Sequence, residues 1–349
     1  MPSDSSRWFL TCCSYEVVEP GIEVPSVKTV QTLESPQMLT QFASRVMKFL
    51  ISDLPVRRRR QRQSTMISIV ETLESRKLLT GFVINPTYDP ATIGNLPNHA
   101  AIEASINNVI SQYEAEFSDP ITVNIAFAGS TNPNDLAFSV APRDSVPYPQ
   151  FLTALKASQT SADDATAVGS LPNTTTEPVQ NGDNVGISTA NEKALGGIAA
   201  RAPGIDGTVT INFSQMNINR TTIDPNNYDL ASTAEHEIDE VLGLGSNMPD
   251  AGDTWIQDLF RYTPTGQRSY STNANVQAFF SLDGHTDLIQ FNQDSTADYG
   301  DWASGAVPHV QDAFGTPGQA GIADPNIEYR AFTIRQPAVH FEFTPAIPG

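Results

Sequence analysis

Residues 236–240 read His-Glu-Ile-Asp-Glu and carry the side-chain types and spacing best suited to chemistry in this sequence. His236 and Glu240 are four positions apart, so on a helix they project from the same side, about one turn apart. An imidazole nitrogen and a carboxylate oxygen are both zinc ligands, so this pair can hold one metal ion. Glu237 stands beside the first ligand, where a carboxylate can act as general base toward a water molecule. The run therefore predicts a metal site with a base next to it.

The flanking residues predict a helix with a defined start and end. Ser232 and Glu235 have the spacing of a capping box, in which each side chain bonds the backbone amide of the other residue. Gly243 and Gly245 permit the left-handed turn that ends a helix. One stripe is expected to face the core, and it consists of Ala234, Ile238, Val241 and Gly245.

This helix resembles the H-E-x-x-H helix of zinc proteases, and Gly243 matches, in register, the glycine of the longer metzincin pattern H-E-x-x-H-x-x-G-x-x-H. The resemblance implies that His236 and Glu240 hold zinc and that Glu237 is the general base for peptide-bond hydrolysis. The sequence departs from the pattern at two positions, because Glu240 replaces the second histidine and Ser246 stands at the third ligand position. A carboxylate in place of a histidine lowers the net charge at the metal.

Asp258 is the third ligand expected from sequence position. It follows the helix after a loop long enough to fold back, and the apolar pair after it would anchor that loop. A set of His236, Glu240 and Asp258 is rich in carboxylates and favours a harder ion than the usual zinc sites do. The next residues, Arg261 and Tyr262, are expected either to line the cleft or to form a structural pair. The remaining histidines have no motif around them: His99, His285, His309 and His340.

A wider likeness covers roughly residues 82–318. The chain resembles a family of bacterial exported proteins classed as metalloproteases. The resemblance implies an α+β, metzincin-like fold: a mixed twisted sheet with a backing helix, the active-site helix and an irregular C-terminal part. The matching segments are 119–125, 235–243, 258–262, 280–284, 300–302 and 311–315.

Residue patterns outside the motif also predict an α+β domain with one mixed sheet. Apolar residues at helical spacing predict a helix over 100–117, and alternation predicts half-buried strands at 121–127 and 208–213. Further predictions are a strand at 82–84 ending in a turn at 85–86, a short helix at 151–156, a long loop at 158–186, a helix at 188–195, and short strands at 278–280 and 341–343.

Charge and cysteine usage limit the class of protein. Residues 1–81 hold 11 Lys and Arg against 8 Asp and Glu, whereas the remainder holds 9 against 31. Such an acidic body repels nucleic acid and anionic membrane surfaces, so neither is an expected partner. No run reaches the roughly 18 apolar residues of a membrane span. Because the only cysteines are Cys12 and Cys13, a metal ion in the acidic body must use His, Asp or Glu ligands.

Three regions are expected along the chain. Residues 1–65, which include a basic run at 57–62, predict a disordered N-terminal extension, and Met66 is a candidate for the true start. Residues 66–81 contain LESRKLL at 73–79, which resembles the short element near the N-termini of exported planctomycete proteins. That resemblance implies an extracellular or cell-surface protein, although a short amphipathic helix is the alternative. Residues 82–349 are the expected catalytic domain.

The function expected from these patterns is that of a secreted metal-dependent peptidase, a monomer acting on proteins or peptides, with zinc at the site and calcium as a structural ion. One alternative is a protein that keeps the fold and has lost catalysis, motivated by Glu240 and Ser246. Another is an exported surface or adhesion module held by calcium, motivated by the acidic runs at 283–287 and 294–301. A third alternative is that the acidic face of the motif helix is simply exposed to solvent and binds no metal ion.

Overall fold

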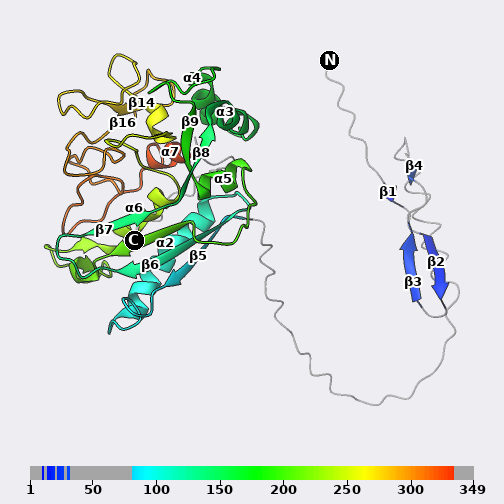
Figure 1. Ribbon diagram of the computed structural model, residues 1–349. Helices are drawn as coiled ribbons and strands as arrows, with labels where there is room; N and C mark the ends of the chain where they lie inside the picture. Colours follow the sequence, from blue (N-terminus) through cyan, green and yellow to red (C-terminus); the bar gives the residue numbers. More distant parts are fainter. Residues whose placement is uncertain (1–9, 12–13, 20–21, 27–29, 32–80, 334–349) are drawn as a thin grey trace, which may run out of the picture. The chain divides into compact units, whose positions relative to one another are not determined.

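The computed structural model describes residues 10–11, 14–19, 22–26, 30–31 and 81–333, in two compact units, Met1–Glu74 and Ser75–Gly349. In the first unit two antiparallel pairs are described (Figure 1): β1 (Leu10–Thr11) with β4 (Val30–Gln31), and β2 (Ser14–Glu19) with β3 (Ile22–Ser26). The rest of the regions predicted as an extension (1–65) and an export segment (66–81) lies outside the described residues, except Gly81, and so does the strand predicted at 341–343.

The second unit is built on a mixed four-stranded sheet in the order β5-β6-β10-β7. Three strands are parallel, β5 (Val83–Tyr88), β6 (Thr122–Gly129) and β10 (Gly207–Ile211), and β7 (Ala137–Val140) is antiparallel at the edge. The predicted alternation is confirmed in β6, where Val123, Ile125 and Phe127 are buried. The predicted turn at 85–86 is wrong: β5 continues through Pro86, which an edge strand tolerates because one side of it needs no ladder hydrogen bonds.

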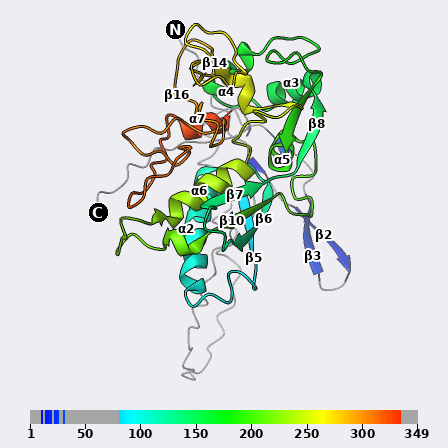
Figure 2. The ribbon, with the colours of Figure 1, turned by 60° about the vertical axis from the view of Figure 1, so that its left-hand side comes forward.

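Two helices cover one face of this sheet. Helix α2 (His99–Glu116) packs on β5, α6 (Leu230–Val241) packs on β10 and β7, and the two helices contact each other (Figure 2). The buried residues of α2 are the predicted apolar stripe: Ile102, Ile106, Val109, Ile110 and Tyr113. The α+β class is therefore confirmed, and the motif helix lies over the antiparallel edge of the sheet.

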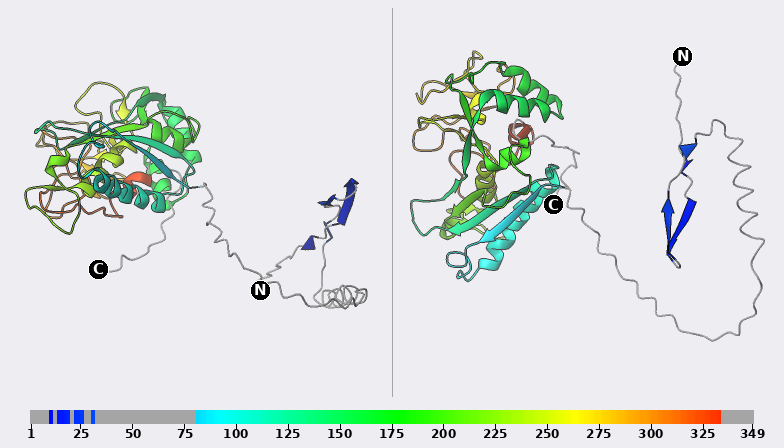
Figure 3. Two further views of the ribbon diagram at one scale, coloured as in Figure 1. Left: turned by 90° about the horizontal axis from the view of Figure 1, so that it is seen from below. Right: turned by 45° about the vertical axis from the view of Figure 1, so that its right-hand side comes forward.

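A second half of this unit surrounds a smaller sheet in the order β13-β9-β8 (Figure 3, right). Its strands are β8 (Arg143–Pro147), β9 (Asn184–Ser188) and β13 (Thr254–Trp255), and its helices are α3 (Tyr148–Ala157), α4 (Ala162–Ser170) and α5 (Thr189–Leu195). The expectation of a single sheet was therefore wrong. The loop predicted at 158–186 was also wrong in part, because it contains α4, which begins with a capping box between Ser161 and Asp164.

The chain after α6 is largely irregular, as predicted. It contains the 3-10 helix η2 (Gln257–Phe260), the antiparallel strands β14 (Arg261–Tyr262), β15 (Phe279–Phe280) and β16 (Ile289–Gln290), and helix α7 (Glu328–Thr333). Between β10 and α6 lie η1 (Phe213–Gln215), β11 (Met216–Asn217) and β12 (Tyr228–Asp229). Phe280, Phe291 and Trp302 form an aromatic cluster that anchors the irregular part. Within residues 81–333 and the short N-terminal strands, no helix is long and apolar enough to cross a bilayer.

Candidate metal centre

Helix α6 presents the predicted pair, but it begins earlier than the sequence suggested. Asp229 is the N-cap, and its carboxylate accepts a hydrogen bond of 2.8 Å from the Ser232 amide. The predicted Ser232–Glu235 capping box was therefore wrong, because Asp229 offers a carboxylate cap three residues before Ser232. The buried stripe is confirmed, since Ala234, Ile238 and Val241 are inaccessible to solvent. The helix end is also confirmed: Gly243 and Gly245 have φ values of +110° and +138°.

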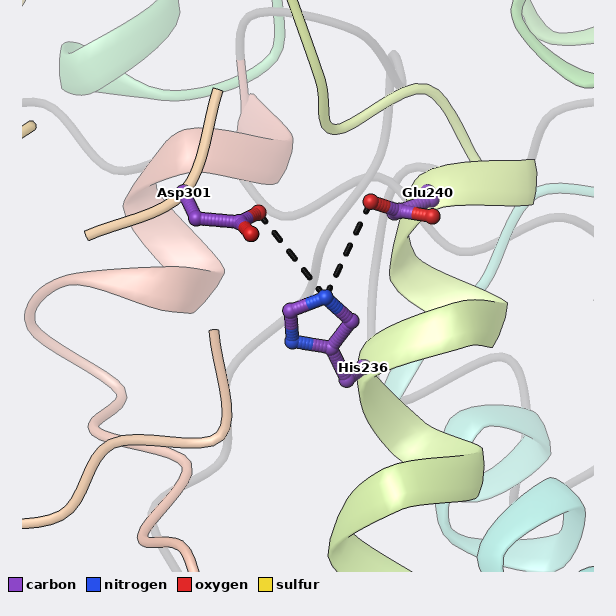
Figure 4. Close-up of side chains that lie close together, drawn as sticks. All are labelled: His236, Glu240 and Asp301. Carbon is purple, nitrogen blue, oxygen red and sulfur yellow. Dashed lines mark ion pairs between the residues drawn. The ribbon is translucent and has the colours of Figure 1, made fainter. Parts of the chain in front are cut away.

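Three side chains converge beside α6 (Figure 4). His236 Nε2 lies 3.7 Å from Glu240 Oε1 and 3.8 Å from Asp301 Oδ1, and the three atoms all lie within 4.8 Å of one another. Donors around a tetrahedral zinc ion with bonds near 2.1 Å are about 3.4 Å apart. The two separations from His236 exceed that spacing by a few tenths of an ångström. The geometry fits a divalent ion bound between the three side chains.

Two of the three ligand side chains are oriented by a neighbour. His236 Nδ1 lies 3.0 Å from the Val310 carbonyl oxygen, so Nδ1 carries a proton and Nε2 faces the carboxylates. The Ser139 hydroxyl of β7 donates to Glu240 Oε2 over 2.7 Å. Such outer contacts are typical of metal sites, where they fix the tautomer and direction of the ligands.

Glycine contacts bring Asp301 to the helix from a distant part of the chain. A Cβ atom on Gly300 would lie 2.6 Å from both Gly245 Cα and the Ser246 nitrogen, so only glycine allows this approach. The buried Gln257 side chain joins the same two segments: it accepts from the Gly245 amide over 2.5 Å and donates to the Gly300 carbonyl over 2.8 Å. Asp301 follows directly, which sets its carboxylate opposite His236.

The charges in the cluster are strongly coupled. Burial lowers the pKa of His236, but the Asp301 and Glu240 carboxylates outweigh it and raise that pKa well above its usual range. Burial raises the pKa of Asp301 to about 7, with Glu240 and Asp298 adding to the effect. Burial alone would raise the pKa of Glu240, yet its bond to His236 lowers it. In the metal-free site, bound protons therefore neutralise part of the negative charge of the buried carboxylates, and a metal cation can replace these protons.

Glu237 lies at the edge of this cluster and has the properties of a base. Only 4% of its surface is exposed, and Oε2 has no hydrogen-bond partner among the described residues. Burial, followed by the neighbouring Glu240 charge, raises the pKa of Glu237 well above its usual range. A carboxylate with a raised pKa accepts a proton more readily at neutral pH.

The centre opens into a cavity of about 460 Å³. Its walls come from β7 and the residues before it, from β12 and α6, and from the segments between Thr296 and Gly321. Both apolar and acidic side chains line it, and none of the lining residues is Lys or Arg. The acidic ones are Asp229, Glu237, Glu240, Asp298, Asp301 and Asp312.

Asp258, the third ligand predicted from sequence, does not join the group in the structure. Its carboxylate accepts from the Ser246 hydroxyl over 2.5 Å and from the backbone amides of Asn247 and Trp255, each over 3.2 Å. The loop does fold back, as expected, but it delivers Asp258 to the turn after α6. The same contact engages Ser246, the residue at the third ligand position of the metzincin pattern.

Other candidate residues also have structural partners. Arg261 donates to the carbonyls of Tyr299 (2.6 Å) and Asn292 (3.1 Å), and thereby holds the segment that leads into Asp301. His99 lies at the start of α2, His285 is exposed in a turn, and His309 lines the cavity. His340 lies outside the described residues.

The sequence contains a pattern around Asp301 that could have indicated a ligand, although its distance along the chain from the motif helix did not. Residues 300–302 read Gly-Asp-Trp, one of the segments on which the predicted resemblance to exported metalloproteases rests. A glycine that permits close packing, a carboxylate and a large aromatic anchor are consistent with a ligand held rigidly on an irregular segment. Comparison of the chain with protein-family models, with curated proteins and with solved structures found no match. The family resemblance therefore stays a prediction.

Proposed function

We propose that this protein is an exported, metal-dependent peptidase. The observation that carries the proposal is the convergence of His236, Glu240 and Asp301 on one point beside Glu237, at the wall of a cavity. A divalent ion held there would polarise a substrate carbonyl and lower the pKa of a water molecule. Zinc is the ion that the resemblance implies, and the two carboxylates also suit a harder ion such as manganese.

Glu237 is the proposed general base. It takes a proton from the attacking water and passes that proton to the leaving amine, as a buried carboxylate beside a ligand histidine can do. Val310 and Ser139 keep His236 and Glu240 in the ligand orientation during this transfer. Because the site lies in a partly enclosed cavity, its charged side chains are largely shielded from bulk water.

The edge strand β7 supports a peptide as the substrate. Within the described part of the chain it pairs only with β10, and residues 136–139 line the cavity. An unpaired strand edge can bind an extended peptide through backbone hydrogen bonds. Ser139 links this strand directly to Glu240, so a chain bound along β7 would pass beside the ligands.

The arrangement of elements also supports a metzincin-like fold. A mixed sheet, a backing helix, a motif helix ending at Gly243 and an irregular C-terminal part are what the resemblance implied. The proposed third ligand departs from that pattern, because Asp301 comes from the irregular part and not from the residues directly after the helix. Export is proposed from the resemblance of residues 73–79 alone.

The calcium-held adhesion module has less support. In the run at 283–287, Asp283 already accepts from the Ser281 and Thr286 hydroxyls and from two backbone amides. In the run at 294–301, Asp294 accepts from the amide and hydroxyl of Thr296. These carboxylates stabilise turns, which accounts for their clustering without an ion. The experiment described next distinguishes an active peptidase from a protein that keeps the fold and has lost catalysis.

The test compares the wild-type chain with Glu237→Gln and with Glu235→Gln, a control on the same helix that does not line the cavity. Metal content is measured by mass spectrometry after loading with zinc or manganese, and hydrolysis is followed on casein. Glu237→Gln should retain the metal and lose hydrolysis by about 10²- to 10⁴-fold, the usual contribution of a general base, while Glu235→Gln retains both. Stoichiometric metal without any wild-type hydrolysis would favour the inactive alternative, and absence of bound metal would overturn the proposal.

A further inference from the structure

We infer that Gln311 is a fourth ligand of this centre and binds the ion through its side-chain oxygen. The inference rests on the proposed metal site and extends it to a residue type that the sequence motif does not include. Gln311 follows Val310, whose carbonyl orients His236, and its own side chain is completely buried.

The amide group of Gln311 occupies a coordination position. Its Nε2 atom lies 3.1 Å from Asp301 Oδ1 and 3.4 Å from His236 Nε2. With bonds near 2.1 Å, adjacent donors are about 3.0 Å apart around a six-coordinate ion and about 3.4 Å apart around a tetrahedral zinc ion. The two separations fall in this range and are shorter than those from His236 to the two carboxylates. The amide therefore stands among the ligand atoms.

The present orientation of the amide is one that a bound cation would reverse. Its nitrogen lies beside a carboxylate oxygen and beside His236 Nε2, which are the atoms that an ion requires. Its oxygen, Oε1, is buried with no hydrogen-bond partner among the described residues. A half-turn about the Cγ–Cδ bond exchanges nitrogen and oxygen, so the unpartnered oxygen faces the ion. Amide oxygens are established ligands of hard cations.

The backbone of Gln311 is fixed beside Asp301. The Trp302 amide donates to the Gln311 carbonyl over 2.9 Å, and the Ala313 amide donates to the Trp302 carbonyl over 2.9 Å. Trp302 is itself buried in the aromatic cluster. Asp301 and Gln311 thus lie on adjacent, mutually hydrogen-bonded segments, so only the Gln311 side chain needs to turn.

A fourth protein ligand has consequences for the reaction. The set becomes one nitrogen and three oxygens, which favours harder ions. Four protein ligands close a tetrahedral zinc site, whereas hydrolysis needs an open position. A hydrolytic ion at this centre would therefore have five or six ligands, and a four-coordinate ion would indicate a structural site.

The experiment measures Co²⁺ and Zn²⁺ binding to the full chain, with Gln311→Leu, Gln311→Glu and, as control, the cavity-lining variant Gln319→Leu. Affinity is obtained by competition with a chelator, coordination from the visible Co²⁺ spectrum, and folding of each metal-free variant from its circular dichroism and thermal unfolding. Gln311→Leu should weaken binding at least 10-fold and change the Co²⁺ spectrum. Gln311→Glu should keep the wild-type spectrum and bind at least as tightly, and Gln319→Leu should behave as wild type.

The outcomes separate this inference from the proposed function. A Gln311→Leu protein that binds Co²⁺ more weakly with an unchanged spectrum would show that Gln311 only positions Asp301, and the inference would fail. If Gln311→Leu does not fold, weaker binding or an altered spectrum in Gln311→Glu would overturn it. Absence of Co²⁺ and Zn²⁺ binding by the wild-type chain would instead contradict the metal site itself.

Discussion

Asp301 and Asp258 are both buried carboxylates near the end of α6, yet their surroundings differ. Asp301 faces His236 Nε2 across 3.8 Å. Asp258 is surrounded by donors, with a hydroxyl and two amides directed at its oxygens. A carboxylate whose oxygens already accept several hydrogen bonds has little left to offer an ion. A carboxylate that faces an imidazole nitrogen can bind an ion together with that nitrogen, once the ion replaces the imidazole proton. The number and type of neighbours therefore separate ligand from structural residue.

Exchanging each carboxylate for an amide tests this distinction. Asp301→Asn should weaken zinc binding at least 10-fold, because a charged ligand is lost. Asp258→Asn should bind zinc with an affinity closer to that of wild type. It should lose about 1–3 kcal/mol of unfolding free energy, because an NH₂ group then faces backbone donors. Chelator competition and urea unfolding of the metal-free proteins measure the two effects. The reverse pattern, with Asp258→Asn folded but metal-free, would restore Asp258 as the ligand.

At the scale of elements, the centre is made where a regular helix meets an irregular segment. Helix α6 supplies two ligands with a spacing that its own hydrogen bonds fix. The segment around Asp301 has no such regularity and is placed by Gly300 against Gly245, by Gln257 and by Arg261. The rigidity of the third ligand therefore depends on close packing between backbones.

Gly300→Ala tests that dependence, and Gly305→Ala is the matched control. The added methyl group at position 300 meets backbone atoms at 2.6 Å, whereas at position 305 it meets nothing within 4 Å. We expect Gly300→Ala to lose about 1–3 kcal/mol, as overpacked sites do, and to weaken zinc binding because Asp301 moves. Urea unfolding and chelator competition report both. Equal behaviour of the two variants would show that this contact does not position the ligand.

At the scale of the whole molecule, the chain has an excess of acidic residues, and some of their carboxyl groups are buried away from the candidate metal centre. Asp119, between α2 and β6, is 5% exposed, and its Oδ2 atom has no hydrogen-bond partner among the described residues. Burial, with the neighbouring Asp164, raises the pKa of Asp119 to about 6. The unfolded value is about 3.9. Between about pH 4 and pH 6 the folded protein therefore holds a proton on Asp119 that the unfolded chain releases.

This shift has a defined sign for stability. The contribution of Asp119 is fully present below about pH 4 and is lost as the pH rises through about 6. Relative to wild type, Asp119→Asn should therefore become more stable as the pH increases from 4 to 7. Asp89 has a pKa lowered by its bond with Thr92, so its contribution is present above about pH 4 and is lost only below that pH. Asp89→Asn should therefore run parallel to wild type from pH 4 to 7. Urea unfolding across this range, with chelator present, measures both variants, and an Asp119→Asn profile parallel to that of wild type would refute the assignment.

Much of the fold could be predicted because amphipathic helices and half-buried strands have residue patterns that repeat every few residues. The stripe of α2 and the alternation of β6 are local patterns, and both were found. Helix α4 was missed because its Ser-, Thr- and Asp-rich surroundings resemble a loop, although Ser161 and Asp164 have capping-box spacing. The smaller sheet was missed because its strands are short and lie far apart in the sequence.

Three features could be predicted from local sequence alone: the motif helix, the shared direction of His236 and Glu240, and the place of Glu237 beside them. One helical turn fixes these relations, whatever surrounds the helix. Only the tertiary structure decided that Asp301 and not Asp258 completes the group, and that Gln311 stands next to it. Those neighbours depend on a glycine contact and on hydrogen bonds between irregular segments, which leave no periodic trace in the sequence.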